Sequence, residues 1–389
     1  DFKPFNSEGA WSATIVEGGD DFITLRSTVE GSGSDNAQQT GVKSIEGAGE
    51  HPIDFWIDFK GTIAENSTPR CAIVRVRYHN YTCEHDIYVR QGYAPITIDG
   101  NAESDKNPAW ASYNVYCFDA NNAPVYTKSP LEEGSLFRRG NRTAILASNN
   151  DRPGFTFGLG PSGSFDVLEL GATTPSQKTW SQLAPSADDV KSRFASWSIA
   201  GDHERIATIE DFYTLESTSI HSNIGKAYGV LYGDGATETQ KSVEVALGYD
   251  HNEDPTNSKK GMRGCFVFNI NNSHNIFFPI GKSGYGRRKG MTSNGEKVGA
   301  LRYAQRTDYY NNDGTGNIQY VPLFYDLFER PGAIYQCRNR LSSTGSDVKK
   351  SSAFDINYFT MGFEGFENGA SNNSDGSDSD ACFIRTVKY

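Results

Sequence analysis

The sequence has little methionine and no long apolar run. Only 3 of its 389 residues are methionine, and it has no stretch of about 18 apolar residues, the length that a membrane-spanning helix needs. Basic residues are also in deficit, since 37 lysines and arginines stand against 48 aspartates and glutamates, for a formal net charge of −11. Nucleic acids and anionic membranes attract basic surfaces. The sequence therefore predicts no membrane span and no nucleic-acid partner.

Sequence patterns for zinc binding and covalent catalysis are missing too. The six cysteines form no C-x-x-C pair, and none has a histidine nearby at the spacing of zinc ligands. None of the seven histidines lies in a G-x-S-x-G turn or beside a cysteine, where a catalytic base is expected. We therefore expect a protein that is not an enzyme. The wide cysteine spacing predicts buried free thiols in the first domain and one or two disulfides in the second.

Glycine, tyrosine and phenylalanine are plentiful, with 40, 20 and 23 residues respectively. Together with clusters of asparagine, serine and aspartate, this composition is typical of β-rich extracellular proteins with long loops. The chain begins at Asp1 without an initiator methionine. We expect a processed, exported protein whose missing N-terminus carried a signal peptide or a lipoprotein signal.

Residues 1–97 predict a small all-β domain. The apolar residues that recur with period 2, and should each share one core-facing side of a strand, are Ile53, Phe55, Ile57 and Phe59, and then Ala72, Val74, Val76 and Tyr78. Trp56 and Asp58, and then Arg75 and Arg77, fall on the opposite sides of these strands, and residues 79–82 predict a hairpin turn. Several short strands without a helix pattern indicate an immunoglobulin-like β-sandwich.

Three segments of this domain resemble the BACON domain, a β-sandwich of exported Bacteroidetes proteins. They are Trp11-Ser-Ala-Thr, Arg70-Cys-Ala-Ile-Val and the closing strand Ile87-Tyr-Val-Arg-Gln-Gly92. The resemblance implies either glycan binding or a spacer, and we favour the spacer for this domain.

Residues 98–389 predict a second, mixed α+β domain. One helix is expected after an N-cap at Ser186, because Val190, Phe194 and Trp197 then share one face. A second helix is expected to begin at Thr208, with acidic residues in its first turn, where they favour the positive end of the helix dipole. Short strands fill much of the remaining sequence.

Four segments of the second domain resemble the Fibrobacter succinogenes major paralogous domain, and they occur in the order of that family. They are Trp110-Ala-Ser-Tyr-Asn-Val115, residues 205–215, Asn275-Ile-Phe-Phe-Pro-Ile-Gly281 followed by Gly284-Tyr285, and residues 381–387. The resemblance implies a C-type-lectin-like α+β fold, as found in surface adhesins and fimbrial tip subunits. Ala207 replaces the usual proline, and insertions at 250–261 and 342–351 keep the family's ligands from being carried over.

A tyrosine-rich segment of the second domain is the predicted ligand site. Aromatic rings stack on the apolar face of a sugar, while nearby amides and carboxylates bind its hydroxyl groups. The tyrosines predicted to contact the ligand are Tyr303, Tyr309, Tyr310, Tyr320 and Tyr325. The alternative is that each ring covers a small core of its own loop.

Two further features could belong to the same site. Arg287 and Arg288 lie in the only basic cluster, which is either a contact for an acidic ligand or a solvated turn. The segment with Asn311, Asp313 and Asn317 has the oxygen ligands that a structural Ca²⁺ takes, although no loop keeps the EF-hand register. We expect no other cofactor.

These features together predict a non-catalytic adhesin or fimbrial tip-like binding protein. It would be exported and either secreted or held at the cell surface, as an outer-membrane lipoprotein or in a fimbria. Its expected partners are a glycan or a host or microbial surface protein, and other pilus subunits. Two alternatives remain open: a carbohydrate-processing enzyme or its accessory module, which needs two acids across a cleft, and a purely structural surface protein.

Overall fold

The computed structural model describes sixteen stretches of the chain: residues 7–27, 40–48, 53–99, 107–138, 141–146, 164–179, 182–183, 204–215, 223–231, 262–279, 301–306, 319–322, 332–336, 352–357, 362–367 and 380–388. The elements within them are almost all strands, and the one helix is α2 (Ile209–Tyr213), with five residues. None of the described helical residues form a segment long and apolar enough to cross a membrane. The prediction of an all-β first domain agrees with this strand-rich structure.

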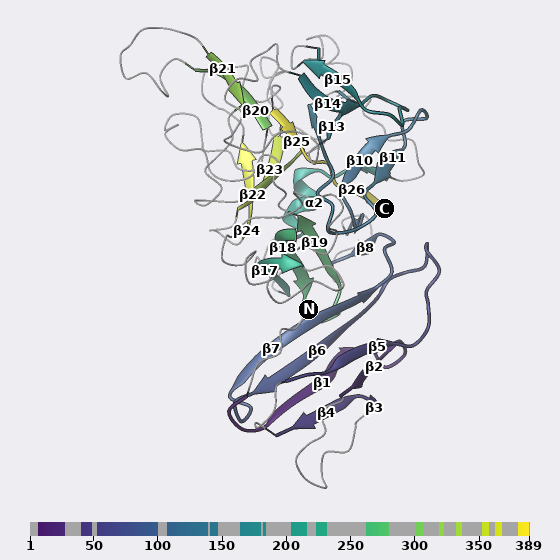
Figure 1. Ribbon diagram of the computed structural model, residues 1–389, viewed down its shortest axis with the longest axis vertical. Coiled ribbons are helices and arrows are strands. Elements are labelled where there is room, and N and C mark those ends of the chain that lie inside the picture. Colours follow the sequence, from purple (N-terminus) through teal and green to yellow (C-terminus); the bar gives the residue numbers. More distant parts are fainter. Residues whose placement is uncertain are drawn as a thin grey trace.

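The N-terminal part is a sandwich of two antiparallel sheets, seen at the lower end of Figure 1. One sheet has the order β4-β1-β6-β7, with β4 (Ser44–Gly47), β1 (Trp11–Gly18), β6 (Arg70–Tyr78) and β7 (Cys83–Gln91). The other has the order β3-β2-β5, with β3 (Thr40–Val42), β2 (Ile23–Arg26) and β5 (Trp56–Phe59). Residues from both sheets, among them Trp11, Leu25 and Val74, are buried in one core between them.

The period-2 pattern of the sequence explains which side of each strand faces this core. Ala72, Val74 and Val76 of β6 are fully buried, as predicted. Arg75 and Arg77 point to the opposite side, where they form ion pairs with acidic residues of β7. Phe59 was expected in the core, but it is 49% exposed at the end of β5, with its ring stacked beside that of Phe22.

The predicted turn at residues 79–82 joins β6 to β7. His79, Asn80 and Tyr81 all have positive φ, between 52° and 65°. The turn is held by the segment before β1, because Asn80 Oδ1 accepts from the N–H of Ala10 at 3.0 Å and the N–H of His79 donates to Ser7 Oγ at 2.8 Å. The bond to Ser7 satisfies a backbone N–H of the turn, and the bond to Asn80 satisfies the N–H of Ala10 just before β1.

The described residues of the C-terminal part form five sheets, and the largest has seven strands. Its order is β15-β14-β13-β12-β25-β20-β21, with β15 (Ser176–Thr179), β14 (Ser164–Leu168), β13 (Ala144–Leu146), β12 (Ser135–Arg138), β25 (Asp380–Cys382), β20 (Leu301–Arg306) and β21 (Gln319–Pro322). The order in a second sheet is β16-β26-β9-β8, with β16 (Glu204–Ile206), β26 (Thr386–Lys388), β9 (Ala109–Trp110) and β8 (Ile96–Thr97). A third sheet has the order β17-β18-β19, with β17 (Ile224–Leu231), β18 (Met262–Asn269) and β19 (Asn275–Pro279). A fourth has the order β22-β23-β24, with β22 (Gly332–Gln336), β23 (Ser352–Asn357) and β24 (Gly362–Glu367). The remaining pair is β10 (Val115–Phe118) and β11 (Pro124–Tyr126).

The last residues of the chain lie in the middle of the C-terminal part. Strand β26 pairs with β16 on one side and with β9 on the other. Residues 383–387 are all buried. Around them the rings of Trp110, Phe212, Phe278 and Tyr335 form an aromatic core, with centroids 4.9–6.3 Å apart. Segments from the beginning, middle and end of this part therefore share one core.

The second predicted helix is present as α2. It begins at Ile209, one residue after the predicted start, and Thr208 is its N-cap, because the Thr208 hydroxyl accepts from the N–H of Asp211 at 3.2 Å. The Asp211 carboxylate accepts in return from the N–H of Thr208 at 2.7 Å, which completes a capping box. Arg205 adds two bonds to the same carboxylate. The helix predicted after Ser186 lies outside the described residues.

The cysteines only partly follow the prediction. Cys71 and Cys83 of the sandwich are free thiols, as expected, but both are half-buried, not fully buried. In the C-terminal part Cys117 and Cys265 are buried thiols, which excludes two disulfides among its four cysteines. Cys337 lies outside the described residues, so a single bridge there stays a prediction.

Candidate functional site

Two of the predicted ligand tyrosines lie on neighbouring strands. Tyr303 belongs to β20 and Tyr320 to β21, and these strands pair with Tyr303 opposite Pro322 and Gln305 opposite Tyr320. The hairpin extends the seven-stranded sheet, where β21 is the edge strand and β20 pairs with β25 near the end of the chain. The backbone of Tyr303 and Tyr320 therefore belongs to the largest sheet that the described residues form.

The other predicted site residues lie outside the described residues. They are Tyr309, Tyr310, Tyr325, Arg287 and Arg288 for the ligand and Asn311, Asp313 and Asn317 for the metal. Five of these eight, those numbered 309 to 317, belong by sequence to the connection between β20 and β21. Within the described part of the chain, no group of three or more histidine, cysteine, aspartate or glutamate residues could hold a metal ion.

The sandwich carries an aromatic and charged surface that the sequence predicted only in part. On the outer side of the sheet β3-β2-β5, the Arg26 guanidinium lies 4.6 Å from the centre of the Trp56 ring. Arg26 also donates to both carboxylate oxygens of Asp58, at 2.8 and 3.2 Å. This bond is the main reason that the pKa of Arg26 is raised. Trp56 is 39% exposed. The sequence placed Trp56 and Asp58 on one side of β5, but only the pairing of β2 with β5 brings Arg26 opposite Trp56.

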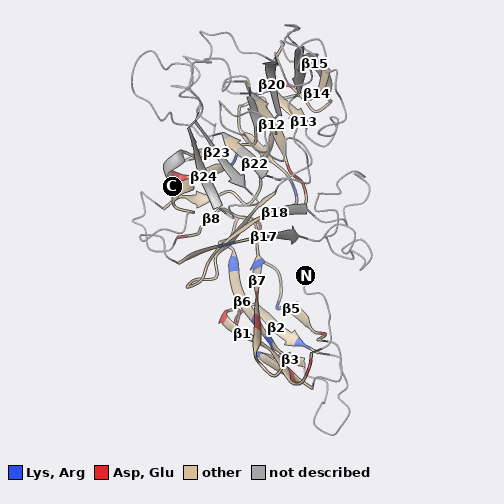
Figure 2. Cartoon of the chain, turned by 90° about the vertical axis from the view of Figure 1, so that its left-hand side faces the viewer, with Lys and Arg blue, Asp and Glu red and all other residues tan. Residues whose placement is uncertain are grey.

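The outer side of the other sandwich sheet carries a row of ion pairs. Figure 2 colours the charged positions of the sandwich strands blue and red. Arg75 binds Asp86 at 2.9 Å and Glu84 at 3.0 Å, and Glu84 also binds Arg77 at 2.9 Å. The register of β6 and β7 places these opposite charges directly across from one another. Since each of these charges already has a partner within the sheet, the row of ion pairs stabilises the pairing of β6 with β7. It does not need an external ligand.

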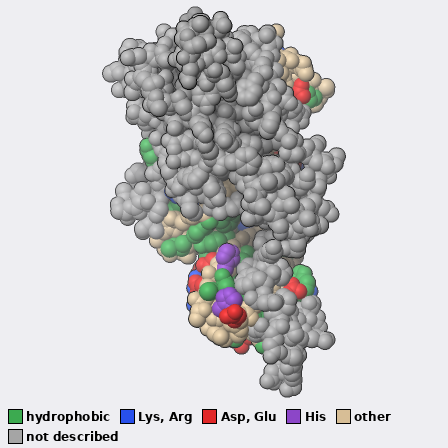
Figure 3. Space-filling model, turned by 60° about the vertical axis from the view of Figure 1, so that its left-hand side comes forward, with side chains coloured by type: hydrophobic (Ala, Val, Ile, Leu, Met, Phe, Trp, Pro, Cys, Tyr) green, Lys and Arg blue, Asp and Glu red, His purple; other side chains and the backbone are tan. Residues whose placement is uncertain are grey.

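The sandwich meets the C-terminal part through apolar and arginine side chains. Figure 3 shows hydrophobic side chains gathered where the two parts come together, with histidine side chains close by on the sandwich. The ring of Tyr88 lies against Phe266 and Phe268 of β18. Arg90 bridges to the backbone of Asn275. Burial is the largest cause of two pKa shifts here: the pKa of Tyr88 is raised to about 12 and that of Arg90 is lowered.

Comparison with protein-family models, with curated proteins and with solved structures gives no match. The two family resemblances of the sequence therefore enter the functional argument as proposals. The geometry contributes three surfaces to that argument: the β20–β21 hairpin, the Trp56 surface of the sandwich, and the junction between the two parts.

Proposed function

We propose that this chain is a non-catalytic, adhesin-like binding protein that contacts its ligand through the β20–β21 hairpin and the connection between its strands. The observation that supports this most directly is the pairing of β20 with β21, because it brings Tyr303 and Tyr320 into one ladder at the edge of the large sheet. The connection between the two strands holds two further tyrosines and the asparagine-rich segment. A loop on a rigid sheet is a common place for binding residues.

The proposed ligand is a glycan or a surface protein of a host or a microbe. Tyrosine rings offer an apolar face for a sugar ring, and asparagine and aspartate side chains offer hydrogen bonds to hydroxyl groups. Arg287 and Arg288 would favour an acidic ligand, because arginine binds carboxylates through paired hydrogen bonds. A structural Ca²⁺ at Asn311, Asp313 and Asn317 would order the connection.

The proposed architecture is a BACON-like sandwich that acts as a spacer and a C-type-lectin-like α+β domain that carries the ligand site. The chain would be exported and would act at the cell surface, in a fimbria beside other pilus subunits, or after secretion. The capped helix α2 and the surrounding strands support the α+β assignment, since the resemblance places a helix entry at residues 205–215 and α2 begins within it.

A glycan-array screen with the full chain, run with and without EDTA, tests the proposed function. We expect binding that is lost in the double variant Tyr309→Ala, Tyr310→Ala. The matched control is Tyr213→Ala, which removes a tyrosine that is exposed on α2 and does not belong to the hairpin. Loss of binding in EDTA would add calcium to the site. A silent array across a broad glycan set would argue against a glycan and favour a protein ligand or a structural role.

A further inference from the structure

The junction between the two parts is defined by Cys71, Tyr88 and Arg90 of the sandwich and by Phe268 and Asn275 of the C-terminal part. Ala72 and Val89 face the sandwich core. Since side chains alternate along a strand, the three sandwich residues point away from that core, toward the C-terminal part. The register places Cys71 directly opposite Arg90. The junction thus uses the end of the β6–β7 pair, beyond the row of ion pairs.

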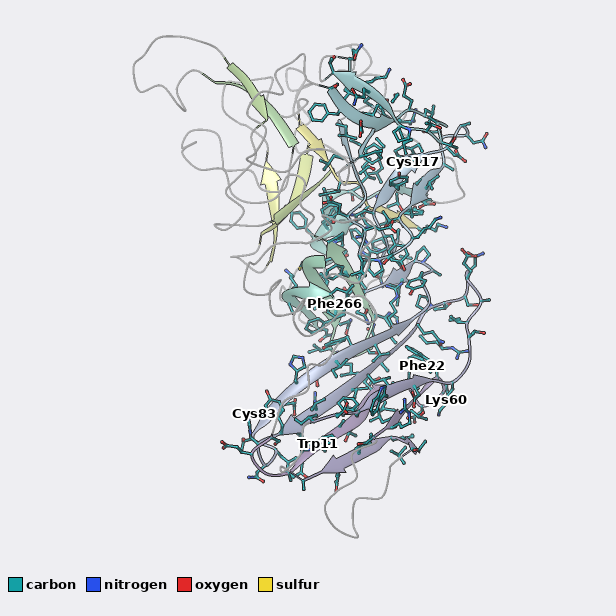
Figure 4. All side chains as sticks on the ribbon, viewed as in Figure 1. Trp11, Phe22, Lys60, Cys83, Cys117 and Phe266 are labelled. Carbon is teal, nitrogen blue, oxygen red and sulfur yellow. The ribbon has the colours of Figure 1, made fainter. Side chains whose placement is uncertain are left out.

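The first contact across the junction is aromatic. The ring of Tyr88 lies 4.2 Å from that of Phe268 and 5.7 Å from that of Phe266, measured between centroids. Figure 4 shows Phe266 at the end of the C-terminal part nearest the sandwich. Phe268 in turn covers Gly225 of β17, where an added Cβ would stand 2.3 Å from the ring. The glycine lets the ring lie low against its own sheet, which leaves room for Tyr88 above it.

The second contact is a set of four hydrogen bonds from Arg90. Within the segment that follows β7, Arg90 donates to the carbonyl oxygens of Gly92 and Ala94, at 3.1 and 2.8 Å. Across the junction it donates to the carbonyl oxygen of Asn275 at 2.8 Å and to Ser112 Oγ at 2.6 Å. All four acceptors are uncharged, so Arg90 is held by hydrogen bonds to carbonyl and hydroxyl oxygens and not by a carboxylate. Burial is the largest cause that raises the pKa of the Cys71 thiol, and the nearby Arg90 charge and Asn275 backbone act against it.

The chain between the two parts is itself held in place. Only residues 92–95 separate β7 from β8, and β8 already pairs with β9 of the C-terminal part. The Ser112 hydroxyl donates to the carbonyl oxygen of Tyr93 at 2.8 Å. Just beyond β8, Asn269 Nδ2 donates to the carbonyl oxygen of Ile98 at 2.9 Å. Backbone carbonyls on both sides of β8 are therefore bound by side chains from elsewhere in the C-terminal part.

We infer that the sandwich and the C-terminal part form one rigid arm, locked across the junction by Tyr88 and Arg90. Domains joined by a short linker commonly move relative to each other unless their interface is extensive. Here Arg90 of the sandwich and Ser112 of the C-terminal part both form hydrogen bonds to backbone carbonyl oxygens of the linker. The contact of the Tyr88 ring with Phe266 and Phe268 adds an apolar interface. The sandwich would then set the orientation of the C-terminal part and not merely its distance from an attachment point.

Cysteine labelling of the full chain tests the lock, because the thiols report on different places. Cys71 lies in the junction, whereas Cys83 lies at the far end of the same strand pair (Figure 4). Cys117 and Cys265 are buried in the C-terminal part and report its unfolding. Maleimide labelling followed by peptide mass spectrometry gives a rate for each cysteine. In the unmodified chain we expect Cys71 to react more slowly than Cys83, because burial raises the pKa of the Cys71 thiol.

Two variants should open the lock and one should not. Tyr88→Ala and Arg90→Gln should each raise the Cys71 rate by about tenfold or more, because labelling follows the local opening equilibrium. Cys83, Cys117 and Cys265 should keep their rates. Removing Arg90 also removes a charge that lowers the pKa of Cys71, so its direct chemical effect would slow the reaction. The matched control is Arg77→Gln, on the same side of β6 but paired with Glu84 away from the junction.

The inference is overturned if Cys71 in the unmodified chain reacts as fast as Cys83, or if both variants leave its rate unchanged. Should either variant also expose Cys117 and Cys265, small-angle scattering of the unmodified chain decides instead. A rigid arm fits one conformation, and a scattering curve that requires many relative orientations of the two parts would exclude it. Neither measurement depends on ligand binding, so a silent glycan array leaves this test intact.

Discussion

The Nε–H of Arg385 donates to Asn114 Oδ1 at 2.8 Å, which joins two residues 271 positions apart in the sequence. The same guanidinium donates to the carbonyl oxygens of Ala111, Ser112 and Phe277, at 2.9 to 3.1 Å. It also lies 4.5 Å from the centre of the Phe278 ring. Arg385 is fully buried, and burial is the main cause that lowers its pKa to about 10. The end of the chain is thus tied to two separate segments of the C-terminal part, residues 111–114 and residues 277–278.

Replacing Arg385 should strongly destabilise the fold. Arg385→Leu would remove the donor to four acceptors, two buried and two partly buried. Orphaned buried polar groups make a loss of about 3 kcal/mol or more the expected result. Urea denaturation followed by tryptophan fluorescence measures the free energy of unfolding. The control is Lys388→Ala, since Lys388 is exposed and lies 3.9 Å from Glu204. It should cost no more than about 0.5 kcal/mol. Equal effects of both variants would contradict the assigned role.

The capping box of α2 predicts a smaller and specific loss. Thr208→Ala removes the hydroxyl that accepts from the N–H of Asp211, and the loss of an N-cap costs about 1 kcal/mol. Thr208→Ser keeps the hydroxyl and should lie close to the unmodified chain. Thermal unfolding of the two variants side by side makes the comparison. A serine variant as unstable as the alanine variant would mean that the methyl group, not the cap, is what matters.

Gly47 of β4 lies directly against Trp11 of β1, its partner in the sheet. An added Cβ at Gly47 would stand 2.3 Å from atoms of the Trp11 ring. Gly47→Ala should therefore destabilise the sandwich by about 1–3 kcal/mol, the usual cost of overpacking. Adding Trp11→Phe should make the effect of Gly47→Ala smaller, because the smaller ring leaves room for the methyl group. Chemical denaturation of the double-mutant cycle gives this coupling, and strictly additive losses would count against the contact.

The junction predicts a loss of stability at high pH. The pKa of Tyr88 is raised from 10 to about 12, chiefly by burial. Between those values the folded chain keeps the proton that the unfolded chain releases, so the stabilisation is present below pH 10 and is lost as the pH rises toward 12. Tyr88→Phe should weaken this decline in melting temperature, measured from pH 8 upward. Tyr213→Phe, at an exposed position of α2, is the control. An identical decline in the Tyr88 variant would refute the assignment.

The sandwich strands were predictable because each local signal agrees with the others. Alternation with period 2 placed Ala72, Val74 and Val76 on one side of β6, and that side is buried. The start of α2 was predictable to within one residue, because acidic residues that favour the first turn of a helix follow Thr208 closely in the sequence. Phe59 departed from the pattern because it lies where β5 ends, and the core does not extend that far.

The candidate site was predictable only as a set of residue types. The tyrosines of residues 303–325 stood out by composition, but the pairing of β20 with β21 and their attachment to β25 depend on contacts distant in sequence. The Arg26–Trp56 contact was unpredictable for the same reason, since the two residues are opposite each other only through the register of β2 and β5. No local sequence pattern specifies which strands pair with each other in a sheet.

By itself the sequence determined the strand-rich composition, the buried sides of the sandwich strands and the beginning of α2, because these follow from residue spacing over a few positions. The tertiary structure decided that β26 lies between β9 and β16, that Arg385 is buried among carbonyl oxygens, and that Tyr88 and Arg90 bind the two parts together. These outcomes required segments far apart in the sequence to pack against each other. From the sequence alone an arginine is expected at the surface, because charged side chains are seldom buried. Only the fold shows that Arg385 is buried among acceptors.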